Sequence, residues 1–147
     1  AVDRGDQQLF AGLFTDAAKV SVDGYDGDAA GFAAQQETGK PGLVRCFHSI
    51  STDYSEINGD EAVGATYLIR FDTAQVEGQE RDTIQGGRFL DRFQCVDGIR
   101  KISERRYVVE WVLNLPGTGT WDEGIYAQLP LHGTRGSDDP VYGFWPK

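Results

Sequence analysis

Alternation of apolar and polar residues marks long strands in the middle of the chain. Five apolar residues share one face of the segment 62–71, with the period of two that is typical of a half-buried strand: Val63, Ala65, Tyr67, Ile69 and Phe71. A longer alternating pattern covers 86–111 and is interrupted at Asp97-Gly98. Asp-Gly is typical of a type I′ hairpin turn, because both central residues of that turn need positive φ. We therefore predict a long antiparallel hairpin here, and a further strand over 43–57.

Helical periodicity is confined to the start of the chain. Asp6 can cap a short helix, because its carboxylate can accept a hydrogen bond from a free backbone N–H of the first turn. The apolar face of that helix is formed by Leu9, Phe10, Leu13 and Phe14. Asp28 can cap a second helix over 29–38 in the same way.

The segments between these elements complete an α+β order. Residues 17–22 are predicted to form a strand, Asp23-Gly24 and Asp26-Gly27 to form turns, and the polar segment 74–86 to form a loop. Helices come first and long antiparallel strands follow, so the helices should pack on one face of the sheet. Long, strongly curved strands under a helix layer predict a cone with an interior cavity.

The 147 residues are enough for one domain with its own core, so we predict a single domain over 1–147. The chain starts at Ala1 with a sequence typical of the middle of a helix–turn–helix, so we expect a helical segment to precede it. The segment 117–147 is rich in Gly and Pro but also carries many aromatic side chains. We expect this irregular tail to pack on the body or on a neighbouring subunit, and the protein to be a homo-oligomer, either a dimer or a trimer.

Charge and composition exclude several kinds of partner. The net charge of −9 argues against binding to nucleic acid and to anionic membrane surfaces. No apolar run approaches the length of a membrane span. Two sparse cysteines predict reduced thiols and a cytoplasmic location, and the two histidines and two cysteines show no metal-ligand spacing. Neither a dinucleotide fingerprint nor a phosphate loop is present, so we predict no cofactor and no metal.

Three segments carry a resemblance to a known family. The run GGRFLDRF, the turn at Asp97-Gly98 and the following K-I-x-x-R…E-W resemble the C-terminal hairpin of SnoaL-like proteins in the NTF2-like superfamily. The segment from His48 to Asp60 and the segment from Ala1 to Phe14 resemble the family's histidine strand and first-helix motif. The resemblance implies the NTF2-like cone, and it points to the branch that contains scytalone dehydratase and hexachlorocyclohexane dehydrochlorinase.

Members of that branch use an Asp–His pair inside the cone, and motif position implies that the pair is Asp3 and His48 in this chain. The dehydrochlorinase also places an arginine at the position of Arg105. The chain departs from the dehydratase pattern at Thr66, where a second histidine would stand. The resemblance therefore carries the pair over, but not the specific dehydratase activity.

His48 suits the role of a general base, because a neutral imidazole can accept a proton near pH 7 and a carboxylate such as Asp3 can fix its tautomer. The alternative is a structural histidine bonded to the same carboxylate. Arg105 can hold an anionic group in a dry pocket. It can equally form a buried ion pair with Asp91 or Glu110.

Four aromatic residues are candidates for substrate binding. Tyr25, Tyr54 and Tyr67 can each direct a hydroxyl into the cavity to polarise a carbonyl, with ordinary packing as the alternative. Trp111 is predicted to form part of the cavity wall.

These residues favour a cofactor-independent lyase or isomerase that removes a proton from a small apolar molecule, either aromatic or polycyclic. The alternatives are a non-catalytic ligand-binding protein, a structural subunit like the β-subunit of ring-hydroxylating dioxygenases, or a polyketide-type cyclase. The fold alone does not separate them, because one fold hosts many activities.

Overall fold

The computed structural model describes residues 2–38, 42–134 and 136–145. Its main element is a curved six-stranded sheet with the order β2-β1-β6-β5-β4-β3. The strands are β1 (Phe14–Val22), β2 (Tyr25–Asp28), β3 (Leu43–Asn58), β4 (Glu61–Val76), β5 (Gln79–Val96) and β6 (Ile99–Pro116). All neighbours are antiparallel except β1 and β6, which are parallel.

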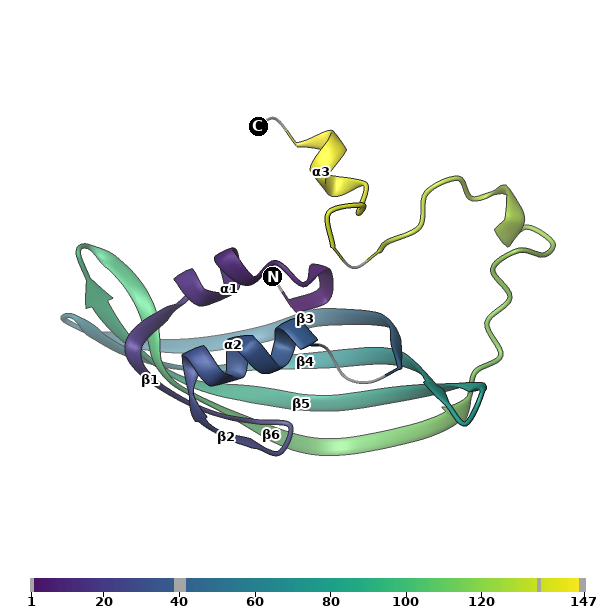
Figure 1. Ribbon diagram of the computed structural model, residues 1–147. Coiled ribbons are helices and arrows are strands. Elements are labelled where there is room, and N and C mark those ends of the chain that lie inside the picture. Colours follow the sequence, from purple (N-terminus) through teal and green to yellow (C-terminus); the bar gives the residue numbers. More distant parts are fainter. Residues whose placement is uncertain (1, 39–41, 135, 146–147) are drawn as a thin grey trace.

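The helices lie on one side of this sheet, as Figure 1 shows. They are the 3₁₀ helix η1 (Val2–Arg4), α1 (Gln7–Gly12) and α2 (Ala29–Thr38). Both predicted caps are confirmed: the Leu9 N–H donates to Asp6 Oδ1 at 2.9 Å, and the Gly31 N–H donates to Asp28 Oδ1 at 2.7 Å. The predicted α+β arrangement, with helices on one face of a curved sheet, is therefore confirmed.

The buried core joins the helices to β1 and β6. Seven buried residues form one cluster: Phe10, Phe14, Ala18, Val20, Val22, Phe32 and Ile102. The ring of Phe10 contacts the rings of Phe14 and Phe32, with centroids 5.0 Å and 5.6 Å apart. Such aromatic pairs stabilise a core beyond their buried area. This cluster fixes α1 and α2 over one end of the concave face.

The predicted turn at Asp97-Gly98 is confirmed, since φ is 52° at Asp97 and 79° at Gly98. The loop predicted over 74–86 is wrong. β4 and β5 continue through this segment and pair down to Val76 and Gln79. They are joined by Glu77-Gly78, where both residues again have positive φ. The polar side chains there are exposed or half-buried at the strand ends, so these strand ends show no apolar alternation.

Two smaller predictions also need correction. Asp26-Gly27 does not form a turn, because these residues lie in β2 and pair with Ser21 and Val20. β1 begins at Phe14 and takes that residue out of the predicted helix. The turn at Asp23-Gly24 is confirmed by positive φ at both residues.

The apolar face predicted for 62–71 turns away from the helices. Phe71 lies opposite Phe47 on β3 and Ile84 on β5, and Ile84 lies opposite Leu113 on β6. Phe71 remains 42% exposed. We call the exposed side chains on this convex side the outer patch: Phe47, Ile69, Phe71, Trp111 and Leu113.

The tail leaves the sheet at Pro116 and returns to the N-terminal segment (Figure 1). It contains the short helices η2 (Tyr126–Gln128) and α3 (Val141–Phe144). The Gly136 N–H donates to the Arg4 carbonyl at 2.7 Å, and Asp139 forms an ion pair with Arg4 at 3.3 Å. Trp121 packs under the Arg45 guanidinium, 4.3 Å from the ring centroid. The tail therefore contacts the body of its own chain.

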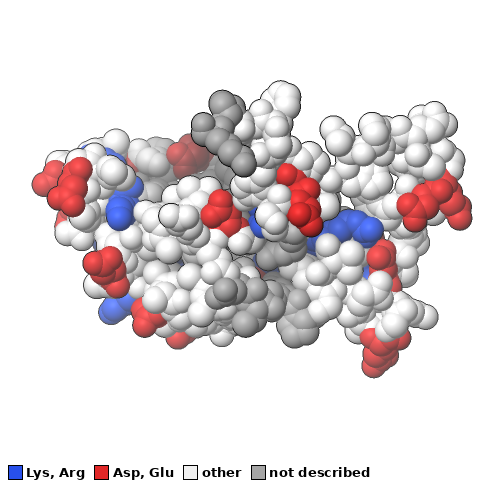
Figure 2. Space-filling model, turned by 45° about the horizontal axis from the view of Figure 1, so that its top comes forward, with Lys and Arg blue, Asp and Glu red and all other residues white. Residues whose placement is uncertain are grey.

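Charged side chains are dispersed over the face shown in Figure 2, where acidic clusters alternate with short basic patches. In the described part of the chain, no helix has the length and apolar character needed to cross a membrane.

Candidate active site

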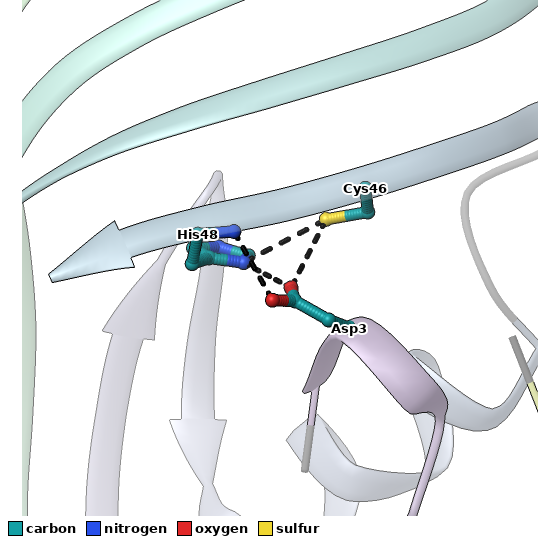
Figure 3. Close-up of side chains that lie close together, drawn as sticks. All are labelled: Asp3, Cys46 and His48. Carbon is teal, nitrogen blue, oxygen red and sulfur yellow. Dashed lines mark hydrogen bonds and ion pairs between the residues drawn. The ribbon is translucent and has the colours of Figure 1, made fainter. Parts of the chain in front are cut away.

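Asp3 and His48 meet at the concave face, although 45 residues separate them in the sequence. Asp3 lies in η1 and His48 lies in β3. Asp3 Oδ1 forms a short hydrogen bond with His48 Nδ1, and Asp3 Oδ2 accepts the His48 backbone N–H at 3.1 Å (Figure 3). The His48 side chain is 17% exposed and that of Asp3 25%. The carboxylate thus fixes the ring at Nδ1, and Nε2 is the nitrogen left for a ligand.

The surroundings of Asp3 favour its charged form. Burial alone would raise the pKa of Asp3. The hydrogen bonds from the His48 ring and backbone N–H, together with attraction to the ring, outweigh burial and hold the pKa below its ordinary value. Asp3 is therefore an ionised partner that can stabilise a positive charge on the imidazole.

His48 lines a pocket between the helices and the sheet. The pocket comprises about 670 Å³ of space not filled by atoms, part of which is open to solvent. Much of its wall is apolar and includes Val2, Phe10, Val22, Phe32, Leu68 and Phe89. A mainly apolar wall with a few polar groups is typical of a small-molecule site.

Arg105 also lines this pocket, and it is held in place by a carboxylate. Its Nε and Nη2 donate to the two oxygens of Asp91 at 2.8 Å and 2.6 Å. Its guanidinium lies over the ring of Phe89, 4.1 Å from the centroid. Of the two partners left open by the sequence, Asp91 is the one observed, since Glu110 pairs with Arg88 instead. Arg105 is thus both the ion-pair partner of the buried Asp91 and a pocket residue.

A second charged cluster in the pocket was not found by sequence reasoning. Arg70 Nη1 contacts Asp23 Oδ2 at 2.5 Å, and Arg70 Nε contacts Asp72 Oδ2 at 2.9 Å. Burial opposes the charge on Arg70, but the two carboxylates raise its pKa above the ordinary value. Arg70 lies opposite His48 on β3, and Asp72 lies opposite Cys46. The only signal in the sequence is that Arg70 and Asp72 alternate with Ile69 and Phe71, so they share the other face of the strand.

Tyr107 and Cys46 are two further pocket residues that the sequence did not single out. The Tyr107 hydroxyl is buried and has no hydrogen-bond partner among the described residues. Burial raises the pKa of Tyr107, as do Asp23 and Asp72, against an opposite effect of Arg70. The Cys46 Sγ lies 3.6 Å from Asp3 Oδ1 and 3.7 Å from His48 Nδ1. Burial and the neighbouring Asp72 and Asp3 carboxylates raise the pKa of the Cys46 thiol.

The four predicted substrate-binding residues do not line this pocket. Tyr25 packs on Phe32 and donates its hydroxyl to the Asp28 carbonyl at 2.8 Å. Tyr54 is 63% exposed and donates to a Glu56 oxygen. Tyr67 and Trp111 lie together on the convex side. Alternation tells which residues share a face of a strand, but not which face the helices cover, so it does not place these side chains relative to the pocket.

The chain belongs to the SnoaL-like domain family, within the NTF2-like superfamily. The model of that family matches residues 1–106. A search of curated proteins finds no match.

Solved structures share the same fold at low sequence identity. A proposed scytalone dehydratase from Novosphingobium aromaticivorans is 17% identical with a TM-score of 0.67, covering 81% of this chain and 85% of its own. A type 3 hexachlorocyclohexane dehydrochlorinase from Novosphingobium barchaimii is 17% identical with a TM-score of 0.66, covering 81% and 83%. A proposed calcium/calmodulin-dependent kinase II association domain from Exiguobacterium sibiricum is 9% identical with a TM-score of 0.59, covering 74% and 81%. These matches show the fold, which includes both lyase-type proteins and a proposed association domain.

Proposed function

We propose that this protein is a cofactor-independent lyase or isomerase that removes a proton from a small, largely apolar molecule. The observation that carries the proposal is the hydrogen-bonded Asp3–His48 pair beside a mainly apolar pocket. The resemblance of the whole fold to a dehydrochlorinase and to a proposed dehydratase supports the same class of reaction. A structural subunit would not need a pocket next to an ionised carboxylate and an imidazole.

The pair supports one proton transfer. In this mechanism Asp3 keeps the ring proton on Nδ1, so that Nε2 carries the lone pair that accepts a proton from the substrate. Nε2 takes a proton from a substrate C–H, and the electrons of that bond form a new C=C bond. In an elimination, the leaving group departs with its own bonding electrons. In an isomerisation, the imidazolium returns the proton to another atom. A positioned general base contributes roughly 10²–10⁴ in rate.

Arg105 and Tyr107 are the groups we assign to the developing negative charge. Asp91 holds two nitrogens of Arg105, which orients the guanidinium and leaves Nη1 for a leaving group or an enolate oxygen. The Tyr107 hydroxyl has no hydrogen-bond partner among the described residues, so its O–H can donate to a substrate. Donors fixed in advance in a dry pocket stabilise a developing anion strongly. Tyr107 thus takes the role that the sequence analysis gave to Tyr25, Tyr54 and Tyr67.

Replacing His48 tests the proposal. Turnover would be measured as chloride release from a hexachlorocyclohexane and as water loss from an aromatic β-hydroxy ketone. We expect His48→Ala to lower the rate on whichever probe is converted by roughly 10²–10⁴. His132→Ala is the matched control, because His132 is exposed in the tail and packs edge-on against Trp121. A His48→Ala protein that is folded and keeps the wild-type rate would remove the proposed base.

A further inference from the structure

We infer that Asp3, Cys46 and His48 form a three-ligand site for a divalent metal ion of the zinc type. These residues offer an oxygen, a sulfur and a nitrogen, and the three donor atoms lie within 4.8 Å of one another. The inference goes beyond the proposed function, because it concerns a ligand that a proton-abstracting enzyme does not need. The spacing of residues in the sequence does not predict the site, because Asp3 is 43 residues away from Cys46.

The distances between donor atoms fit a tetrahedral zinc ion. Zn–S bonds of about 2.3 Å and Zn–N bonds of about 2.0–2.1 Å place the sulfur and nitrogen about 3.6 Å apart at a tetrahedral angle. The observed separations from Cys46 Sγ are 3.7 Å to His48 Nδ1 and 3.6 Å to Asp3 Oδ1. Only the hydrogen-bonded pair of Asp3 and His48 must open, to about 3.3 Å.

The backbone already orients all three ligands. Cys46 and His48 are alternate residues of β3, so their side chains leave the strand on the same side (Figure 3). Asp3 faces them from η1. The His48 N–H binds Asp3 Oδ2, which holds the carboxylate while Oδ1 points at the other two donors. Hydrogen bonds of this kind to a ligating carboxylate are typical of protein metal sites.

The charges around the three ligands also favour a cation. Among the described residues, Arg70 and Arg105 are the basic residues of the pocket wall, and each forms an ion pair with a carboxylate. Asp72, which lies opposite Cys46, has its buried Oδ1 without a hydrogen-bond partner among the described residues. A metal ion would therefore meet negative charge from Asp3, from the Cys46 thiolate and from nearby Asp72.

Metal binding and proton abstraction exclude one another at this site. When the metal binds, the Cys46 thiol loses its proton to solvent, and the His48 Nδ1 lone pair goes to the metal. The ring proton must then sit on Nε2, so the base no longer has a lone pair for a substrate. Three protein ligands leave the fourth position of a tetrahedral ion to water. We therefore expect zinc to be a reversible inhibitor of the proposed reaction.

Titration with Co²⁺ tests the site without any substrate. Cobalt takes up the tetrahedral zinc geometry and gives an intense thiolate-to-metal absorption when a cysteine binds it. We expect one equivalent to bind to the wild-type protein with this absorption, and excess Zn²⁺ to displace it. Cys95→Ser is the matched control, because Cys95 is the other free thiol and lies on β5. It should bind like the wild type.

Cys46→Ser should lose the thiolate absorption and bind Co²⁺ at least about tenfold more weakly. Asp3→Asn gives a second reading if the first variant does not fold: it should keep the absorption but also bind more weakly. The absence of a thiolate absorption in the wild type, or equal binding by the wild type and a folded Cys46→Ser protein, would overturn the inference. Failure of His48→Ala to affect turnover would instead refute the proposed reaction and leave the cobalt result standing.

Discussion

At the scale of single residues, protonation of Asp3 links the site to the stability of the fold. Its hydrogen bonds to His48 hold the pKa below the ordinary value, so the folded chain binds that proton less tightly than the unfolded chain. The stabilisation is present above the unfolded pKa of about 3.9 and is lost as the pH falls through the lower folded value.

We expect Asp3→Asn to reduce this acid sensitivity. The amide cannot ionise, so the free energy of unfolding should fall less steeply below about pH 4 than in the wild type. Urea unfolding at a series of pH values measures both slopes. Identical slopes would mean that Asp3 titrates alike in the folded and unfolded chains.

Removal of the Tyr107 hydroxyl tests whether this group stabilises the developing negative charge. We expect Tyr107→Phe to lower turnover by on the order of 10²-fold, because it removes one donor at the developing anion. Its thermal midpoint should stay at or above that of the wild type, since the hydroxyl is buried without a partner among the described residues. Tyr54→Phe, at an exposed residue outside the pocket, is the control. A Tyr107→Phe protein with full activity would remove Tyr107 from the mechanism.

Sequence motifs predicted the positions of Asp3 and His48 because the family pattern places both on named segments. Arg70 and Tyr107 could not be found in this way. They reach the pocket only because β4 and β6 present those positions on the concave side, and the covered side of a strand depends on where the helices pack. Physical reasoning from periodicity therefore recovers the strand but not its orientation.

At the scale of elements, the paired glycines of β5 make room for the aromatic side chains of β6. A Cβ on Gly87 would lie 2.5 Å from the Val108 carbonyl oxygen and 2.6 Å from the Tyr107 hydroxyl. A Cβ on Gly86 would lie 2.1 Å from Trp111 Nε1. The register between β5 and β6 shifts between these two glycines, as at a β-bulge. Glycine is thus required at both positions, because a side chain would clash with the residues of β6.

We expect Gly87→Ala to destabilise the fold by about 1–3 kcal/mol, because a backbone atom must move to admit the new methyl group. Gly12→Ala is the matched control, since nothing lies within 4 Å of its added Cβ. It should change stability by less than about 1 kcal/mol, in the stabilising direction. The midpoint of urea unfolding distinguishes the two variants. Equal midpoints would contradict the steric argument.

The long hairpins were predictable wherever a turn dipeptide interrupted an apolar alternation. Asp97-Gly98 met that condition, and its positive φ angles follow. Glu77-Gly78 did not, because the flanking residues of β4 and β5 are polar and give no alternation. These ends of β4 and β5 are nevertheless paired by backbone hydrogen bonds, with Gln75 opposite Glu80. Backbone hydrogen bonds between strands do not depend on side-chain type, so polar strand ends of this kind are hard to predict from the sequence.

At the scale of the whole molecule, the described residues of the chain leave the outer patch exposed. Phe47, Ile69, Phe71, Trp111 and Leu113 are each between 37% and 59% exposed. The rings of Phe47 and Phe71 contact each other, with centroids 6.1 Å apart, so the patch is contiguous across strands. Contiguous apolar surfaces of this kind are typical of association sites. We propose that a second copy of this chain covers it.

Phe71→Glu tests this proposal, because it places a charge at the centre of the outer patch. We expect light scattering to give a dimer or a trimer for the wild type and a monomer for the variant. Phe144→Glu is the control, since Phe144 is exposed in α3 and outside the outer patch. A wild-type protein that scatters as a monomer would contradict the proposal.

The return of the tail to Arg4 has a practical consequence for anyone who trims or tags this protein. Arg4 is the neighbour of Asp3, and its carbonyl and side chain are both held by the tail, through Gly136 and Asp139. Proteolysis or truncation of the chain after β6 would remove both contacts to Arg4. A loss of the proposed activity in such a protein would then come from a displaced Asp3 carboxylate near the N-terminus, even with every pocket side chain unchanged.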